Sequence, residues 1–236
     1  MNTDSHLAAG DSLGSAAAIL RPPLVLWLIV EAAWGLHGQL AGLLPEESGI
    51  APLFLLSTLC YLAIAVFAVV YVRRDPEAAR VFAPPRPRTV EFCVVVGLVS
   101  SLLLSMWQSL PYSDDSGQWG PGESGSGWPV WLSLVATAVT PAIYEEFMYR
   151  GLFLQRFTQV FGWPFANTFQ AVLFATMHFD SWAMLPHFAF GLVAGVLRRS
   201  AGALWPCILF HFLWNGHVVL RSYGLWHSLL RMLHLA

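Results

Sequence analysis

The chain has 236 residues, of which 56% are hydrophobic and 11% charged, and its formal net charge is −2. Its mean hydropathy is +0.59. Soluble domains carry roughly 25% charged residues, so this chain has too little polar surface to cover a globule in water. The composition excludes an ordinary soluble domain. The absence of a basic patch with interleaved aromatic residues argues against a nucleic-acid partner.

Several apolar runs approach the length of about 20 residues that a helix needs to cross the hydrocarbon core. They predict an all-α, polytopic membrane helical bundle of about seven transmembrane helices plus amphipathic segments. The predicted spans are 24–43, 51–72, 90–110, 129–149, 164–180, 183–198 and 203–220. The stretches 151–163 and 222–236 are expected to lie in the membrane interface as amphipathic helices.

These spans divide the chain into four parts. A flexible lead-in (1–22) is followed by the N-terminal transmembrane helices (23–128), a transmembrane core (129–220) and an amphipathic C-terminal tail (221–236). Five of the twelve basic residues lie in the loop 73–88, which the positive-inside rule places in the cytoplasm. The loops 44–49 and 111–128 contain acidic residues and no basic ones, and are predicted to lie outside.

All basic residues are arginines and the chain has no lysine. We interpret this as the composition of a GC-rich bacterial genome, which predicts a multi-pass protein of the bacterial inner membrane. Cys60, Cys93 and Cys207 each lie in an apolar run without metal-type spacing, and their number is odd. They are therefore expected to be free thiols.

Ionisable groups are expensive in hydrocarbon, and they persist there when they pair, line a wet cavity or carry function. The segment AIYEEFMYR, 142–150, places three of them at the end of an apolar run. Glu146 and Arg150 are four residues apart, so they share a helix face and are predicted to form an ion pair. Glu145 is rotated by about 100° from Glu146 and points elsewhere. The alternative is a solvated charge cluster at a helix end.

Three more polar residues lie in the later spans. His178 follows Phe174 by four residues, and a lone histidine of this kind is more often a satisfied core residue. His211 and Asn215 are also four apart and share a face, a pattern that could also bond a neighbouring helix. His187 and His217 have no partner at helical spacing. Together, a carboxylate, two histidines and a carboxamide form a workable hydrolytic set, with a base for water and donors for an oxyanion.

These residues resemble the three motifs of a known family. Glu145-Glu146-Arg150 is similar to E-E-x-x-x-R, Phe174-His178 to F-x-x-x-H, and His211-Asn215 to H-x-x-x-N of the CPBP family. That family comprises type II CAAX prenyl endopeptidases and bacteriocin-processing proteins, also called intramembrane glutamic endopeptidases. Each motif alone is weak, but the three occur in the right order and within residues 129–220. Residues 1–128 add spans and no motif.

The resemblance implies peptide-bond hydrolysis in the membrane without a metal or other cofactor, and makes 129–220 the catalytic core. It implies that Glu145 and His178 activate water and that His211 and Asn215 form the oxyanion hole. Glu146 and Arg150 would support the site, and Phe174 would pack beside His178. One consequence is geometric. If 164–180 were a simple crossing, His178 would lie far from Glu145, so this span must be displaced, broken or preceded by a re-entrant segment.

Two other classes of function stay open. In a zinc-dependent intramembrane protease, His178, His211 and a glutamate would supply three metal ligands, although the chain lacks H-E-x-x-H. A non-catalytic immunity or scaffold protein, or a transporter pocket, would also hold polar groups in a membrane. The expected partners are membrane lipid and a membrane-anchored protein or peptide substrate, with the chain itself a monomer. Candidate substrates are bacterial C-terminal sorting tails, bacteriocin-type precursors and CAAX-type tails.

Overall fold

The computed structural model describes residues 14–30, 88–107, 129–178 and 181–232, with single positions at 32, 59, 62, 63, 66, 70 and 84. Within these residues the regular secondary structure is helical, and no strand occurs. The all-α prediction is therefore confirmed for the described part of the chain. The predicted span 51–72 and the loops 44–49, 73–88 and 111–128 lie wholly or almost wholly outside it.

A continuous helical stretch runs from residue 130 to residue 161. It consists of α4 (Val130–Ser133), the π-helical segment η4 (Leu134–Val139), α5 (Thr140–Glu146), the π-helical segment η5 (Phe147–Phe153) and α6 (Leu154–Phe161). The stretch begins after Pro129, whose ring fixes φ at −65°. It ends at Gly162, where φ of +80° is a left-handed conformation that favours glycine.

The wide turns before α5 have a local cause. Pro141 lies in the first turn of α5, and a proline has no backbone N–H to give to a carbonyl four residues back. The Thr140 hydroxyl instead donates to the Val135 carbonyl, five residues back, at 2.9 Å. Single π-helical turns inside α-helices occur frequently at functional sites, and here they flank the segment that carries the paired glutamates.

The chain then reverses into α7 (Trp163–Thr176), which packs against α6 and η5. Phe157 of α6 stacks on Phe169 of α7 with ring centroids 4.9 Å apart. Tyr149 of η5 meets Phe174 edge-on at 5.2 Å. The C-terminal end of α7 therefore lies beside η5, the segment that directly follows the glutamates.

This arrangement corrects one prediction from the sequence and agrees with another. The stretch 151–163 is not a separate interfacial helix, because residues 151–161 continue the preceding helix and bury Phe153, Leu154 and Phe157 inside the protein. The span 164–180 is not a simple crossing. Fourteen residues of α7 rise only about 21 Å, less than the roughly 30 Å of a hydrocarbon core.

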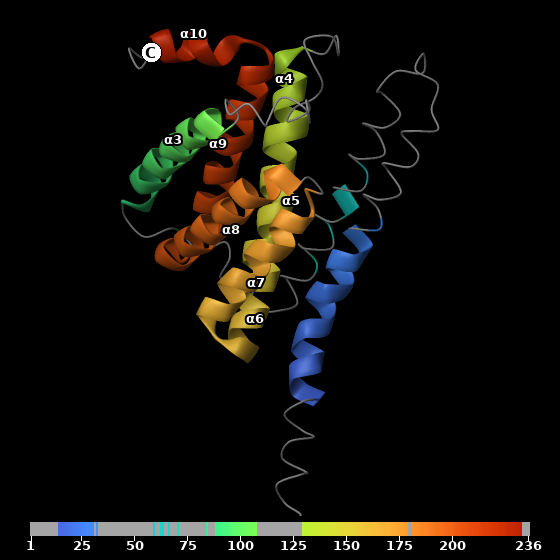
Figure 1. The fold of residues 1–236 in the computed structure, drawn as a ribbon. Helices are drawn as coiled ribbons and strands as arrows, with labels where there is room; N and C mark the ends of the chain where they lie inside the picture. The colour runs from blue at the N-terminus through green and yellow to red at the C-terminus, as the bar shows by residue number, and fades with distance from the viewer. Residues whose placement is uncertain are drawn as a thin grey trace, which may run out of the picture.

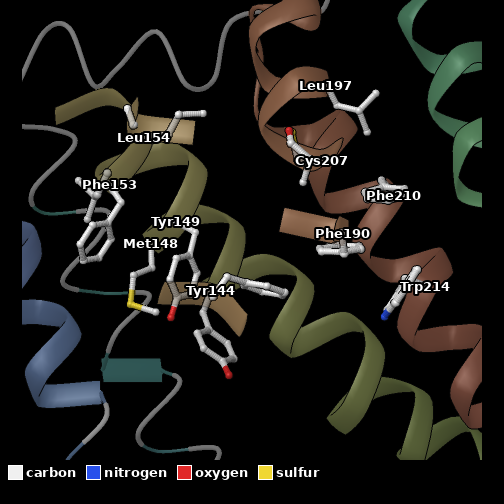
Figure 2. Packing of buried hydrophobic residues seen from close by; sticks show 14 of the residues in the cluster. Tyr144, Met148, Tyr149, Phe153, Leu154, Phe190, Leu197, Cys207, Phe210 and Trp214 are labelled. Carbon is white, nitrogen blue, oxygen red and sulfur yellow. The ribbon is translucent and has the colours of Figure 1, made fainter. Parts of the chain in front are cut away.

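Two further helices complete the core. α8 (Ser181–Ala201) contains Pro186, and α9 (Trp205–Ser222) follows after a turn at Gly202, where φ is +71°. Figure 2 shows two groups of residues in the core cluster, with Tyr144, Met148, Tyr149, Phe153 and Leu154 on the long helical stretch and a second group on α8 and α9. The second group is Phe190, Leu197, Cys207, Phe210 and Trp214.

α3 (Thr89–Trp107) lies beside α9, and α10 (Leu225–Met232) crosses the end of α9 (Figure 1). α3, with 19 residues, is the one described helix that is both long and apolar enough to cross a membrane. Its buried face carries small residues, with Cys93, Gly97 and Ser101 spaced four residues apart. The predicted span 90–110 is thus present as a helix, whereas the count of seven spans is not established.

Both ends of the described chain are helical. A helix occupies Gly14–Val30, so the expected lead-in 1–22 already becomes helical at its alanine-rich SAAAIL segment, as helix propensity allows. In the tail, α10 turns Trp226 inward and leaves Leu225 about 41% exposed. An exposed Leu225 beside an inward Trp226 fits the amphipathic helix predicted for the tail, and its place in the membrane interface stays a prediction. Cys93 and Cys207 are buried free thiols, as predicted; Cys60 lies outside the described residues.

Candidate active site

The paired glutamates lie where the long helical stretch passes α9. Glu146 is fully buried, and its Oε1 accepts a hydrogen bond from Arg150 Nη1 at 2.7 Å. The ion pair expected from the four-residue spacing is present. The same oxygen accepts a hydrogen bond from His211 Nδ1 at 2.8 Å. Glu146 therefore joins its own helix to α9 through one carboxylate oxygen.

Glu145 faces the other edge of the same imidazole. Its Oε2 lies 3.8 Å from His211 Nε2, and its side chain retains 13% exposure. Its Oε1 accepts a hydrogen bond from the Tyr144 hydroxyl at 2.7 Å. The two adjacent carboxylates, rotated by about 100° on their helix, thus approach different nitrogens of one ring. Glu146 bonds Nδ1 of His211, and Glu145 lies near Nε2.

Arg150 is enclosed by aromatic rings. Its guanidinium carbon lies 4.6 Å from the centroid of Phe174 and 5.4 Å from that of Phe190. A cation over an aromatic face is attracted to it, and the attraction is stronger away from water. Arg150 is 1% exposed, so Glu146 and these rings together hold a positive charge inside the protein.

Phe174 occupies the centre of the cluster. Its ring lies 5.8 Å from His211 and 5.1 Å from His178, measured between centroids. The predicted neighbourhood of Phe174 and His178 is therefore present, and the same phenylalanine also reaches Arg150 and His211. His178 Nδ1 donates to the Phe174 carbonyl at 3.0 Å, since a carbonyl can only accept. Within the described residues, His178 makes no direct hydrogen bond to Glu145.

Asn215 lies one turn beyond His211 on α9, and its Nδ2 donates to the Thr137 carbonyl at 2.9 Å. Pro141 is four residues after Thr137 and cannot supply the usual helical N–H to that carbonyl. The proline thereby explains why this backbone oxygen can accept a side chain from α9. One hydrogen of the Asn215 carboxamide is used in this bond, and the other is not.

The structure thus brings Glu145, Glu146, Arg150, Phe174 and His211 into one contacting cluster, with His178 against Phe174 and Asn215 a turn away. The antiparallel return of α7 brings His178 against Phe174, as the sequence predicted, while its approach to Glu145 stays a prediction. Catalytic roles for these residues stay a prediction at this point.

Sequence reasoning missed His187. Its ring stacks on His178 with centroids 3.5 Å apart and an interplanar angle of 24°, and its Nδ1 donates to the Ala183 carbonyl at 2.7 Å. His187 has no partner at helical spacing in the sequence, so the sequence did not predict it as a site residue. Its partner, His178, lies in the turn after α7, so no spacing within α8 could have revealed it.

Two further sets of contacts were also missed. Tyr144 holds Glu145, and the carboxamides of Asn167 and Gln170 lie buried between α7 and α8. Asn167 and Gln170 are three residues apart in an otherwise apolar helix, which is a usable signal for a shared polar face. The tyrosine gave none, because neighbours in sequence do not normally face each other on a helix.

A buried carboxylate and imidazole cluster among the helices that the structure describes defines the class of site, one suited to acid and base chemistry away from bulk water. The family follows from comparison with known proteins. Residues 127–217 match the family described as type II CAAX prenyl endopeptidase Rce1-like, so this part of the chain is similar to that family of endopeptidases. The match covers all the candidate site residues. No curated protein and no solved structure matches the chain.

Proposed function

We propose that the chain is an intramembrane endopeptidase in which Glu145 is the general base and acid. The observation that carries the proposal is the contact of one buried imidazole, His211, with two adjacent glutamates at 2.8 and 3.8 Å. Glu146 is committed to Arg150 and His211 and is fully buried. Glu145 keeps some exposure and has only Tyr144 as a close donor, so it is the carboxylate available to a water molecule.

In the proposed reaction, Glu145 takes a proton from water as the oxygen attacks the peptide carbonyl. The protonated carboxyl then gives that proton to the amide nitrogen as the C–N bond breaks. His178 would orient the water. Its Nδ1–H is used by the Phe174 carbonyl, so Nε2 of the neutral ring is an acceptor that can bind one hydrogen of the water.

His211 and Asn215 would stabilise the oxyanion of the tetrahedral intermediate. Because His211 Nδ1–H is directed at Glu146, Nε2 can donate to an oxyanion only when the ring carries both protons. Asn215 has one carboxamide hydrogen left after its bond to Thr137. Glu146 and Arg150 would position His211 without touching the substrate.

The substrate we propose is a membrane-anchored protein or peptide precursor, cut near its membrane segment by a monomeric enzyme of the bacterial inner membrane. The apolar composition, the exposed apolar surface of α3 and the membrane-embedded family support a multi-pass protein. Seven spans remain the proposed count. The absence of lysine favours a bacterial sorting-tail or bacteriocin-type precursor over a CAAX-type tail.

The zinc alternative requires three protein ligands that converge on one point. Among the residues that the structure describes, no group of three or more His, Cys, Asp or Glu side chains could hold a metal ion. His178 stacks face to face with His187 instead of sharing a point with it. The arrangement of the residues therefore favours the glutamate mechanism over a metal site.

The test that separates an enzyme from a scaffold uses Glu145→Gln, which removes the base with almost no change in shape. Membrane proteins from cells making the wild type and the variant are compared by mass spectrometry of their termini. We expect a precursor to accumulate uncut in the variant. Glu91→Gln is the matched control, because Glu91 lies exposed in the first turn of α3.

A scaffold would keep its cellular phenotype in Glu145→Gln, with identical termini in all three strains. That result, obtained with the variant present at wild-type level in the membrane, would refute the proposed function.

A further inference from the structure

Two carboxamides lie buried between α7 and α8, outside the motifs described above. Asn167 and Gln170 are 5% and 1% exposed. Gln170 Nε2 donates to the Gly191 carbonyl of α8 at 2.9 Å, and Asn167 Nδ2 donates to the Leu192 carbonyl at 3.2 Å. Gln170 Nε2 also lies 3.0 Å from Asn167 Oδ1. The two side chains therefore form one unit that holds α7 to the backbone of α8.

Glycines on α8 allow this close approach. A Cβ added to Gly195 would lie 1.6 Å from Asn167 Oδ1, and one added to Gly191 would lie 2.8 Å from the Ala171 backbone. Larger residues would push the helices apart and break both carboxamide contacts. The glycines and carboxamides together fix the register in which Gln170 lies opposite Gly191.

That register places site residues opposite each other one turn further along. Phe174 follows Gln170 by four residues, and His187 precedes Gly191 by four. Their rings lie 6.0 Å apart, and His178, in the turn that follows α7, stacks on His187 at 3.5 Å. A slip of one turn would move one helix by about 5.4 Å past the other and would separate these rings.

The Gly191 carbonyl also reaches the charged cluster. Arg150 Nη2 donates to it at 3.5 Å, in addition to the Nη1 bond to Glu146. One backbone oxygen is thus shared between Gln170 and Arg150. A change at Gln170 acts on the guanidinium through this oxygen, and then on Glu146 and His211.

Packing alone does not require the carboxamides. Ala171 against Gly191 already provides the close approach that small residues give between membrane helices. Gln170 Oε1 is buried without a hydrogen-bond partner, which is a cost that an apolar residue would avoid. A residue kept at such a cost is better explained by what its donor group holds in place.

We propose that Gln170 is a positioning residue of the candidate active site, which acts through the Gly191 carbonyl on Arg150. The proposal rests on the proposed function for its kinetic consequence, and on geometry alone for the link between Gln170 and Arg150. Asn167 supports Gln170 by accepting its second hydrogen and by holding α8.

The kinetic test uses Gln170→Met, which keeps the length of the side chain and removes its donor. With the purified full chain and the precursor identified in the termini experiment, kcat falls about 10-fold, the effect of one misplaced hydrogen bond. KM stays within about a factor of two, because Gln170 touches no substrate. Thr168→Val is the matched control on the exposed side of α7 and leaves both constants unchanged.

A second measurement needs no substrate. The unfolding midpoint in detergent is compared for Gln170→Met, Arg150→Lys and the double variant. Because both residues share one carbonyl, the double variant loses clearly less than the sum of the single losses, whereas Thr168→Val with Arg150→Lys is additive. If Gln170→Met does not insert into the membrane, Gln170→Asn retracts the same carboxamide by one methylene and replaces it in both measurements.

Wild-type kcat in Gln170→Met, or additive midpoints with Arg150→Lys, would overturn the inference. A raised KM with unchanged kcat would do the same, since it would assign Gln170 to substrate binding. If the midpoints of the variants are non-additive but the wild-type chain cleaves no precursor, the link between Gln170 and Arg150 stands. Only the proposed function is then overturned.

Discussion

His211 and His217 lie on the same helix, α9, and each is about 2% exposed. Their surroundings differ in charge. His211 is bonded to Glu146 and faces Glu145 with its second nitrogen. His217 Nε2 lies 2.6 Å from the Ser105 hydroxyl of α3, its Nδ1 is buried without a partner, and its ring meets Trp226 edge-on at 4.4 Å.

The comparison shows that burial of a histidine does not by itself make a reactive site. At the His211 end, two carboxylates from another helix approach the ring, and one of them is paired with an arginine. At the His217 end, a serine and an indole hold α3 and α10 against α9, and Arg221 donates to the Ser105 carbonyl at 3.1 Å. The first arrangement suits chemistry, and the second joins helices.

The comparison is tested most strongly by removing the carboxylate that distinguishes the two ends. Glu146→Ala leaves Arg150 buried without its partner, and breaking a buried ion pair in this way costs about 3–5 kcal/mol of stability. Unfolding of the purified protein in detergent measures the loss. The exposed Glu91→Ala serves as the control and changes stability by less than about 0.5 kcal/mol. A similarly small loss for Glu146→Ala would mean that the pair does not hold the site together.

The next effect compares the two histidines directly. His211→Gln removes a proposed oxyanion donor, and we expect kcat to fall about 10²- to 10³-fold. His217→Gln touches no reacting group, and kcat stays within about a factor of three. Both are measured on the precursor identified in cells. Equal losses in the two variants, with both proteins folded, would remove the functional distinction between the two ends of α9.

A smaller effect is expected from the serine that holds His217. Ser105→Ala leaves the buried Nε2 of His217 without that partner, at a cost of about 1–2 kcal/mol. The matched variant Ser101→Ala removes a hydroxyl that bonds only to the Gly97 carbonyl of its own helix. It should cost less than about 0.5 kcal/mol. Unfolding midpoints decide the matter, and a larger loss in Ser101→Ala than in Ser105→Ala would contradict the role given to the Ser105–His217 contact.

The smallest expected effect is that of metal removal on the cleavage rate. If the His211 end works with carboxylates and imidazoles alone, treatment with a strong chelator leaves the cleavage rate within about a factor of two, and added zinc does not raise it. Loss of cleavage on chelation followed by recovery with zinc would reverse the choice between the two mechanisms. The stability of the protein, measured in parallel, separates loss of a catalytic metal from unfolding.

The sequence was sufficient for much of this site because the decisive spacings are local. The four-residue interval between Glu146 and Arg150 places both on one face of any helix, and the ion pair follows. The same holds for Phe174 with His178 and for His211 with Asn215. Apolar composition likewise indicated helices and the approximate position of α3, because the length of an apolar run is a property of the chain alone.

Contacts between helices were beyond the reach of the sequence. Three contacts join residues from different segments of the fold. They are the stacking of His178 on His187, the bond of Asn215 to Thr137 and the approach of Glu145 to His211. Their existence depends on the direction and register of neighbouring helices, which hydropathy does not encode. The interpretation of 151–163 as a separate helix failed for the same reason, since residues 151–161 continue the preceding helix and pack against α7.

By itself, the sequence determined that the chain is helical and apolar, and which residues share each helix face, because a helix converts spacing into direction. Only the tertiary structure decided that α7 turns back at Gly162, so that Phe174 and His178 return to the level of the glutamates. It also decided that His211 of α9 bonds the glutamate already paired with Arg150, and that Glu145 keeps some exposure. These outcomes depend on the packing of whole helices against one another, which no local spacing specifies.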